Sequence, residues 1–150
     1  MRRLSGLLLA GALMMLPVFS QSHVHAAEQA AQKLTFDGDT ALWTVAIKPD
    51  KTADFEKLMG KVQEALGKLN RKPQADGWKL VKSGKAMPDG NIPYVHVISP
   101  VVKDADYTVM AILYEANTDP AVQRELYDLY RGAFGANLGA AGYAAVKLGQ

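Results

Sequence analysis

Two hydrophobic periodicities follow one another in the first half of this chain, and they predict a strand and then a helix. Residues 42–48 (LWTVAIK) alternate between the two sides of an extended chain, with Trp43 on the more apolar side. Over residues 52–70 apolar side chains recur every three or four positions, which predicts an amphipathic helix capped by Thr52. Pro73 lies just beyond this run and is typical of a helix end.

The second half of the chain predicts three more strands and a divided helical region. Residues 77–83 and 92–99 are short β-type runs separated by a turn-rich connection, so they predict a hairpin. Residues 104–116 are ambiguous: aromatic and β-branched residues favour a strand, whereas helical spacing and leading aspartate caps favour the helix that we expect. An Asp-Pro pair at 119–120 predicts a further helix. The glycine-rich residues 139–142 predict a turn, and residues 143–148 after it predict a short final strand.

The predicted element order is β-α-β-β-α-β with a broken second helical region, which is typical of a ferredoxin-like arrangement. We therefore expect one α+β domain over residues 41–150, with a four-stranded antiparallel sheet and helices on one face. Residues 27–40 are polar and turn-rich, which predicts a flexible lead-in. Both faces of the predicted sheet carry apolar side chains. The face without helices therefore needs its own cover, and a second sheet is the simplest one.

The N-terminus has the layout of a cleavable secretory signal peptide over residues 1–26. Two arginines precede an apolar run at residues 4–19, and small residues suit cleavage after Ala26. The apolar run is short for a bilayer span, so we expect an exported protein, periplasmic or secreted, with an uncleaved anchor as the alternative. The chain contains no cysteine, which excludes disulfides, a lipid-modified N-terminus and cysteine-type zinc sites.

The charge balance argues against one broad class of partner. The formal net charge of +2 equals the contribution of Arg2 and Arg3, so the chain without its predicted signal is neutral. A neutral domain is a poor candidate for nucleic-acid binding, and we expect neither a nucleic-acid partner nor membrane contact after cleavage. The sequence contains no recognised motif for nucleotide, phosphate or metal binding, so we expect no cofactor and no metal.

His96 is the histidine that remains after cleavage, and it lies at the centre of the predicted strand 92–99. Tyr94 shares its face, and Trp43 and Trp78 lie on predicted neighbouring strands. These four side chains could line an apolar pocket with polar tips, suited to a planar organic ligand. The alternative is ordinary filling of the core and of a subunit interface. His96 is also the candidate catalytic residue, because a lone histidine can act as a general base.

Residues 42–59 (LWTVAIKPDKTADFEKLM) and the hairpin strands WKLVKS and YVHVIS resemble the dimeric α+β barrel superfamily, which includes antibiotic biosynthesis monooxygenases and haem-degrading monooxygenases. The resemblance implies that two subunits pack their sheets face to face and that each keeps a ligand cavity between sheet and helices. The haem-degrading members have a constellation of Asn, Trp and His. This chain offers Trp78 and His96, and its first predicted strand offers no Asn.

Two functions stay open at this point, and both include a homodimer. The first is an exported protein that binds a small apolar or aromatic ligand in a dimeric α+β barrel, with or without a cofactor-independent oxygenation. The second is a non-catalytic homodimeric interaction module of the cell envelope.

Overall fold

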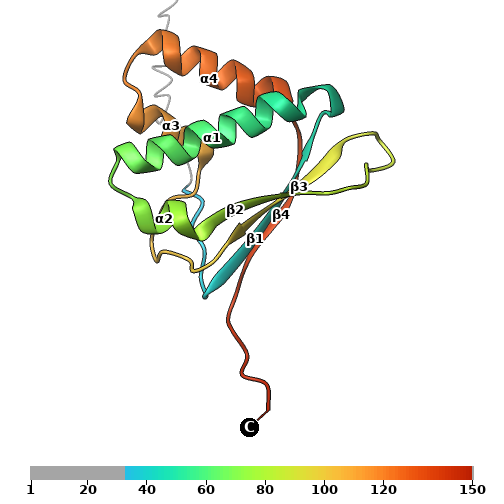
Figure 1. Ribbon diagram of the computed structural model, residues 1–150, viewed down its shortest axis with the longest axis vertical. Helices are drawn as coiled ribbons and strands as arrows, with labels where there is room; N and C mark the ends of the chain where they lie inside the picture. The colour runs from blue at the N-terminus through green and yellow to red at the C-terminus, as the bar shows by residue number, and fades with distance from the viewer. Residues whose placement is uncertain (1–32, 150) are drawn as a thin grey trace, which may run out of the picture. The chain divides into compact units, whose positions relative to one another are not determined.

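The computed structural model describes residues 33–149 (Figure 1). The predicted signal peptide at 1–26 lies outside the described residues, as do residues 27–32 of the predicted lead-in. Within the described part of the chain, no helix has both the length and the apolar character that a membrane span requires. The elements in chain order are β1 Thr40–Ile47, the short 3-10 helix η1 Pro49–Lys51, α1 Thr52–Lys68, α2 Lys72–Gly77, β2 Trp78–Lys82, β3 Ile92–Ile98, α3 Val109–Ala116, α4 Pro120–Ala133 and β4 Phe134–Tyr143.

The strands form one four-stranded antiparallel sheet in the order β2-β3-β1-β4. Its register sets Trp43 of β1 and Leu80 of β2 on either side of His96 in β3. Because side chains alternate between the faces of a strand and paired residues share a face, these three side chains point the same way. The prediction of an α+β domain with a four-stranded antiparallel sheet is confirmed.

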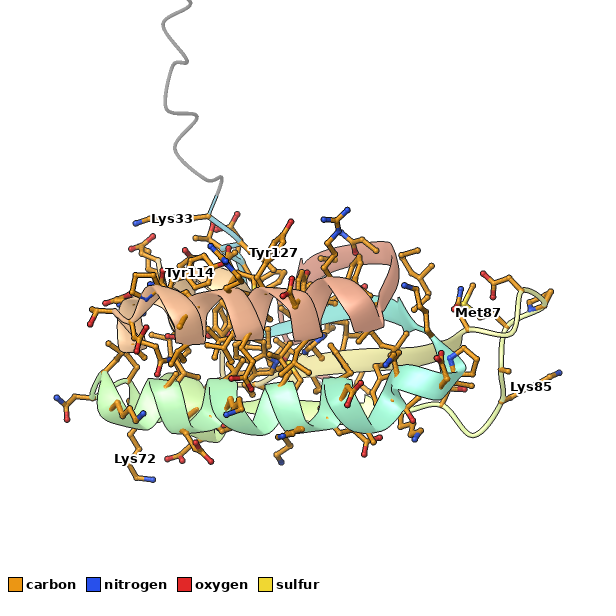
Figure 2. The ribbon with its side chains drawn as sticks, turned by 90° about the horizontal axis from the view of Figure 1, so that it is seen from above. Lys33, Lys72, Lys85, Met87, Tyr114 and Tyr127 are labelled. Carbon is orange, nitrogen blue, oxygen red and sulfur yellow. The ribbon has the colours of Figure 1, made fainter. Side chains whose placement is uncertain are left out.

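The helices cover one face of this sheet (Figure 1), and α1 and α4 lie side by side along it (Figure 2). α1 turns its apolar stripe toward the sheet, where Phe55, Leu58, Val62 and Leu66 are at most 1% exposed. The core therefore lies between the helices and the face that carries Trp43 and its paired neighbours. The connection between β2 and β3, marked by Lys85 and Met87 in Figure 2, extends past the ends of the helices.

The helix starts agree with the sequence only in part. Asp119 caps α4 as predicted, since its side chain accepts a hydrogen bond from the Ala121 amide at 2.8 Å. Thr52 does not cap α1: it is the first helical residue, Lys51 precedes it, and no side chain caps this end. The short helix α2 does not follow from the sequence pattern, in which Pro73 indicates a helix stop. Proline is equally suited to a first helical turn, where its missing N–H costs nothing.

The region 104–116 is helical only in its second part, and its aspartates do not cap the helix. The position before α3 is Thr108, without a side-chain cap. Asp106 instead accepts hydrogen bonds through one carboxylate oxygen from the amides of Thr108 (2.9 Å) and Leu34 (3.1 Å). The choice of helix over strand is confirmed, while Asp106 serves to fasten the loop to an earlier segment, since a carboxylate oxygen can accept two N–H groups.

That earlier segment belongs to the predicted lead-in, and its described part packs against the domain. The Tyr107 amide donates to the Leu34 carbonyl at 2.8 Å, and the rings of Phe36 and Tyr107 lie 5.6 Å apart. Phe36 is only 8% exposed. Residues 33–39 are therefore held by both backbone hydrogen bonds and apolar contact, and β1 already begins at Thr40.

The predicted final strand at 143–148 is wrong, because the last strand is β4, which ends at Tyr143. Residues 139–142, expected to form a turn, lie inside this strand and pair with β1. A β-ladder is made by backbone groups, so a glycine- and alanine-rich run can pair wherever a strand edge is free. At Gly142 the backbone of Asp37 approaches so closely that any Cβ would collide with its carbonyl oxygen.

Candidate functional site

His96 lies at the centre of the sheet's covered face and is completely buried. The alternation along β3 turns Tyr94, His96 and Ile98 toward the helices, and each of the three is at most 1% exposed. On the neighbouring strand β1, the Trp43 ring stacks on the imidazole, with centroids 4.3 Å apart and an interplanar angle of 18°. Phe55 of α1 packs nearly perpendicular to the imidazole, with the two ring centroids 6.1 Å apart.

One hydrogen bond fixes the tautomer of this histidine. Trp78 Nε1 donates to His96 Nδ1 at 3.0 Å. Because an indole nitrogen can only donate, Nδ1 must be the unprotonated nitrogen, and the proton of the neutral ring sits on Nε2. His96 Nε2 is buried and has no hydrogen-bond partner among the described residues. A buried donor without an acceptor is unusual in a folded protein and calls for a structural or functional reason.

Burial also decides the charge of His96. Removal from water lowers the pKa of the imidazole from its ordinary value of 6.5 to about 4. The ring is therefore neutral at physiological pH, as its bond from Trp78 requires. The neutral imidazole is fully enclosed, and Trp43 and Trp78 are among the side chains that it contacts directly.

Two polar side chains that the sequence analysis did not single out form hydrogen bonds with the aromatic residues around His96. Trp43 Nε1 donates to Asn137 Oδ1 at 3.1 Å, across the β1–β4 pair. Tyr94 donates its hydroxyl to Glu56 Oε1 at 2.5 Å. Asn137 carries the single side-chain amide of the glycine- and alanine-rich strand β4, a signal that could have singled it out.

Glu56 is the charged group closest to the cluster. Besides the Tyr94 hydroxyl, it accepts a bond from Lys82 Nζ at 3.0 Å. The hydrogen bond from Tyr94, followed by that from Lys82, holds the pKa of Glu56 below its ordinary value, so this carboxylate is ionised at neutral pH. Burial and the same contact with Glu56 raise the pKa of Tyr94, which stays protonated.

A cavity of about 300 Å³ lies beside this cluster, between α1 and the edge strand β2. Trp78 and Leu80 come from the covered face of β2, and the opposite wall is supplied by one face of α1. Trp78 is thus shared: its indole N–H points to His96, and other atoms of the same residue line the cavity. The lining residues are Glu56, Met59, Gly60, Gln63, Trp78 and Leu80.

The cavity combines an apolar floor with polar groups at its walls. Gln63 Nε2 donates to the Trp78 carbonyl oxygen at 3.1 Å, which holds the edge strand against the helix. Gly60 keeps the α1 wall low, since a Cβ placed there would meet nothing within 4 Å. Ligand sites in proteins are commonly concave and apolar with a few placed polar groups, and this cavity lies at the small end of their size range.

The structure brings the four predicted site residues together but places them in different surroundings. Trp43, His96 and Trp78 form one continuous cluster, and Tyr94 lies two residues from His96 on the same face. All four are almost completely buried, and Trp78 is the one that also lines the cavity. The sequence pointed to the cluster and missed the polar residues of the cavity wall, Glu56 and Gln63.

Within residues 33–149, no three or more histidine, cysteine, aspartate or glutamate side chains lie close enough together to hold a metal ion. Comparison with known protein families, with curated proteins and with solved structures found no match to this chain.

Proposed function

We propose that this protein binds a small, flat, apolar molecule in the cavity between α1 and β2. The observation that carries the proposal is the position of Trp78, which lines the cavity and donates a hydrogen bond to the buried His96. Trp78 is 4% exposed, so it offers a planar ligand a small but rigid contact, and a rigid side chain loses little conformational entropy on binding. The bond to His96 fixes that side chain in advance, so His96 is a positioning residue in this proposal.

The charge at the cavity wall narrows the class of ligand. Glu56 is ionised, and Tyr94 and Lys82 both donate to its Oε1, so its Oε2 favours a molecule that presents a hydrogen-bond donor or a positive group. The Trp78, Leu80 and Met59 side chains favour an apolar body. The proposed ligand is therefore a single-ring or two-ring aromatic molecule with one donor group, which suits a cavity of about 300 Å³.

A cavity-filling substitution tests the proposal without touching the aromatic cluster. In Gly60→Leu the new side chain occupies the cavity, and we expect the affinity for 1-naphthylamine, a neutral, flat, fluorescent two-ring probe with one amino donor group, to fall at least about tenfold. Gly67→Leu is the matched control, because Gly67 also lies in α1 with open space at its Cβ but outside the cavity. Probe fluorescence titration measures both.

Equal affinities of the two variants for the probe would refute binding in this cavity. An oxygenation of the bound molecule would consume dissolved oxygen, so the same titration followed with an oxygen electrode separates binding from turnover.

A second observation favours a further role, self-association into a homodimer. Within the described sheet, Lys79 is the single charged residue among those that β1, β2 and β3 turn away from the helices. Leu42 and Val81 on this outer face are 37% and 53% exposed. The outward residues are Thr40, Leu42, Thr44, Ala46, Lys79, Val81, Pro93, Val95 and Val97.

A nearly uncharged, largely apolar sheet face of this kind is typical of a surface that another layer covers. The strand order with helices on one face supports a ferredoxin-like arrangement, and we propose that two copies pack these outer faces together as in a dimeric α+β barrel. Val81→Asp places a charge on this outer face, on the edge strand β2. Sedimentation velocity should show a dimer for the unmodified protein and a monomer for this variant, and a monomeric unmodified protein at micromolar concentration would refute the proposal.

A further inference from the structure

A second cavity, of about 410 Å³, lies between the start of α2, the loop 101–106 and α3. It shares no lining residue with the cavity between α1 and β2, and its size is within the range of small-molecule sites. Part of its lining is apolar: Ile112 of α3 is 1% exposed, and Val102 and Ala105 come from the loop. We call it the α2–α3 cavity.

The most deeply buried polar side chain of this cavity is Gln74 of α2, which is only 3% exposed. Its Nε2 donates to the Asp106 carbonyl oxygen at 2.7 Å, which fixes the orientation of the side-chain amide. No group among residues 33–149 donates a hydrogen bond to its Oε1. Buried amide oxygens normally have a donor, so a molecule in the cavity that carries an N–H group would complete the hydrogen bonding of Gln74.

Asp106 supplies a second acceptor beside Gln74. Its Oδ1 accepts the amides of Leu34 and Thr108, which holds the loop in place, while its Oδ2 accepts no hydrogen bond from the described residues. The bond from Gln74 Nε2 to the Asp106 carbonyl oxygen makes the two residues neighbours. Neighbouring oxygens of this kind, one of them on a carboxylate, suit an ammonium group, which has three donors to share between them.

Arg71 supplies a positive group one helical turn before Gln74. The Gln74 amide donates to the Arg71 carbonyl oxygen at 3.1 Å. A single guanidinium nitrogen, Nη2, donates to both carboxylate oxygens of Glu115, at 2.8 and 2.9 Å. In the part of the chain that the structure describes, the N–H groups on Nε and Nη1 have no acceptor. Glu115 therefore holds the guanidinium in place while its other N–H groups stay available to a carboxylate in the cavity.

The charges around this cavity are balanced rather than of one sign. Three basic and three acidic side chains line it, and they are Lys33, Arg71, Lys103, Asp104, Asp106 and Glu115. Such a lining gives no general preference for an anion or for a cation, whereas a molecule with one charge of each sign can satisfy both kinds of group. The apolar part of the lining favours a molecule that also carries an apolar group.

We propose that the α2–α3 cavity binds a free amino acid with an apolar side chain. The ammonium group of the amino acid binds to Gln74 Oε1 and Asp106 Oδ2, its carboxylate binds to Arg71, and its side chain packs against Ile112. This site is separate from the cavity that Trp78 lines, and it does not depend on the ligand proposed there.

Isothermal titration calorimetry with L-leucine as the probe tests this site. We expect saturable binding of one leucine per chain. Leucinamide lacks the carboxylate and 4-methylpentanoate lacks the ammonium group, so each should bind at least about tenfold more weakly than leucine. No saturable binding of leucine at up to about 10 mM, or equal affinities for the three molecules, would overturn the proposal.

A pair of substitutions in adjacent residues tests the carboxylate contact. Arg71→Gln removes the guanidinium and should weaken leucine binding at least about tenfold. Lys72→Gln is the matched control, because Lys72 is also basic but binds Asp76 and lies outside the cavity. Circular dichroism should give both variants the same spectrum, since both positions are on the surface of the helix start. Equal leucine affinities in the two folded variants would contradict the contact and the proposal with it.

Nuclear magnetic resonance locates the bound leucine without any substitution. We expect the largest chemical-shift changes at the backbone amides of Gln74, Asp106 and Ala111, which line the α2–α3 cavity. Changes confined to Gly60 and Gln63 would place the leucine in the cavity between α1 and β2 and would overturn the assignment made here.

Discussion

Acidification from pH 7.5 to pH 5 should destabilise this protein through His96. The imidazole is enclosed and neutral, and its pKa of about 4 in the folded protein lies below the ordinary value of 6.5 that applies to the unfolded chain. Between these two values the unfolded state binds a proton that the folded state refuses. Stability is therefore complete above pH 6.5 and falls as the pH drops toward 4.

The size of the effect follows from the separation of the two pKa values. Each unit of separation corresponds to about 1.4 kcal/mol, so the full loss approaches about 3 kcal/mol at the acid end. At pH 5 the linkage relation gives a loss of about 2 kcal/mol relative to pH 7.5. This is a large part of the stability of an ordinary small domain, about 5–15 kcal/mol.

Urea denaturation at a series of pH values from 5 to 7.5 measures this loss as a shift of the midpoint. With a slope typical of small proteins, about 2 kcal/mol per molar urea, the midpoint should fall by about 1 M over that range. His96→Asn is the reference variant, because its side-chain oxygen can replace Nδ1 as the acceptor of the Trp78 N–H and does not titrate. It keeps the other two histidines of the chain, so their contribution cancels in the comparison.

The test compares the stability that each of the two proteins loses between pH 7.5 and pH 5. The original protein should lose about 2 kcal/mol more than His96→Asn between pH 7.5 and pH 5. Parallel pH profiles would show that His96 titrates normally in the folded protein and would contradict its enclosure. A profile in which the original protein gains stability toward acid would reverse the sign and refute the reasoning entirely.

Two further substitutions test the packing around the site. Trp78→Phe removes the donor to His96 Nδ1 and should cost about 1–3 kcal/mol in urea denaturation, because it leaves a buried acceptor unpaired; a cost indistinguishable from zero would show that the bond contributes nothing. Gly142→Ala should lower the melting temperature by several degrees, since its Cβ collides with the Asp37 carbonyl, whereas Gly132→Ala has open space in a helix and should be neutral or stabilising. Equal melting temperatures for these two alanine variants would contradict the close approach at Gly142.

The elements that the sequence predicted well are those whose local pattern and tertiary surroundings agree. The alternation in 42–48 and the helical spacing in 52–70 correspond to β1 and α1, and each predicted end lies within two residues of the observed one. The Asp-Pro pair at 119–120 begins α4 because the cap and the proline act within one turn. In each case the physical signal lies within the element or within two residues of its ends.

The errors fall where local signals were weak or had two meanings. β4 is rich in glycine and alanine, so its side chains carry no period, and its pairing depends on the free edge of β1 some 90 residues earlier. Pro73 can end a helix or begin one, and only the path of the chain into β2 decides between them. Asp106 could cap a helix but meets the Leu34 amide, which is distant in sequence.

The candidate site shows the same difference between what local patterns predict and what depends on contacts distant in sequence. Alternation along the chain was enough to predict that Tyr94 and His96 share one face of their strand and that Trp43 and Trp78 lie on neighbouring strands, because alternation is a property of the backbone. The packing of the fold set the rest: His96 is enclosed, Trp78 is its donor, and Asn137, Glu56 and Gln63 complete the surroundings. These contacts join residues between 15 and 94 positions apart, and no periodicity along the chain encodes which of many possible partners the packed fold brings within hydrogen-bonding distance.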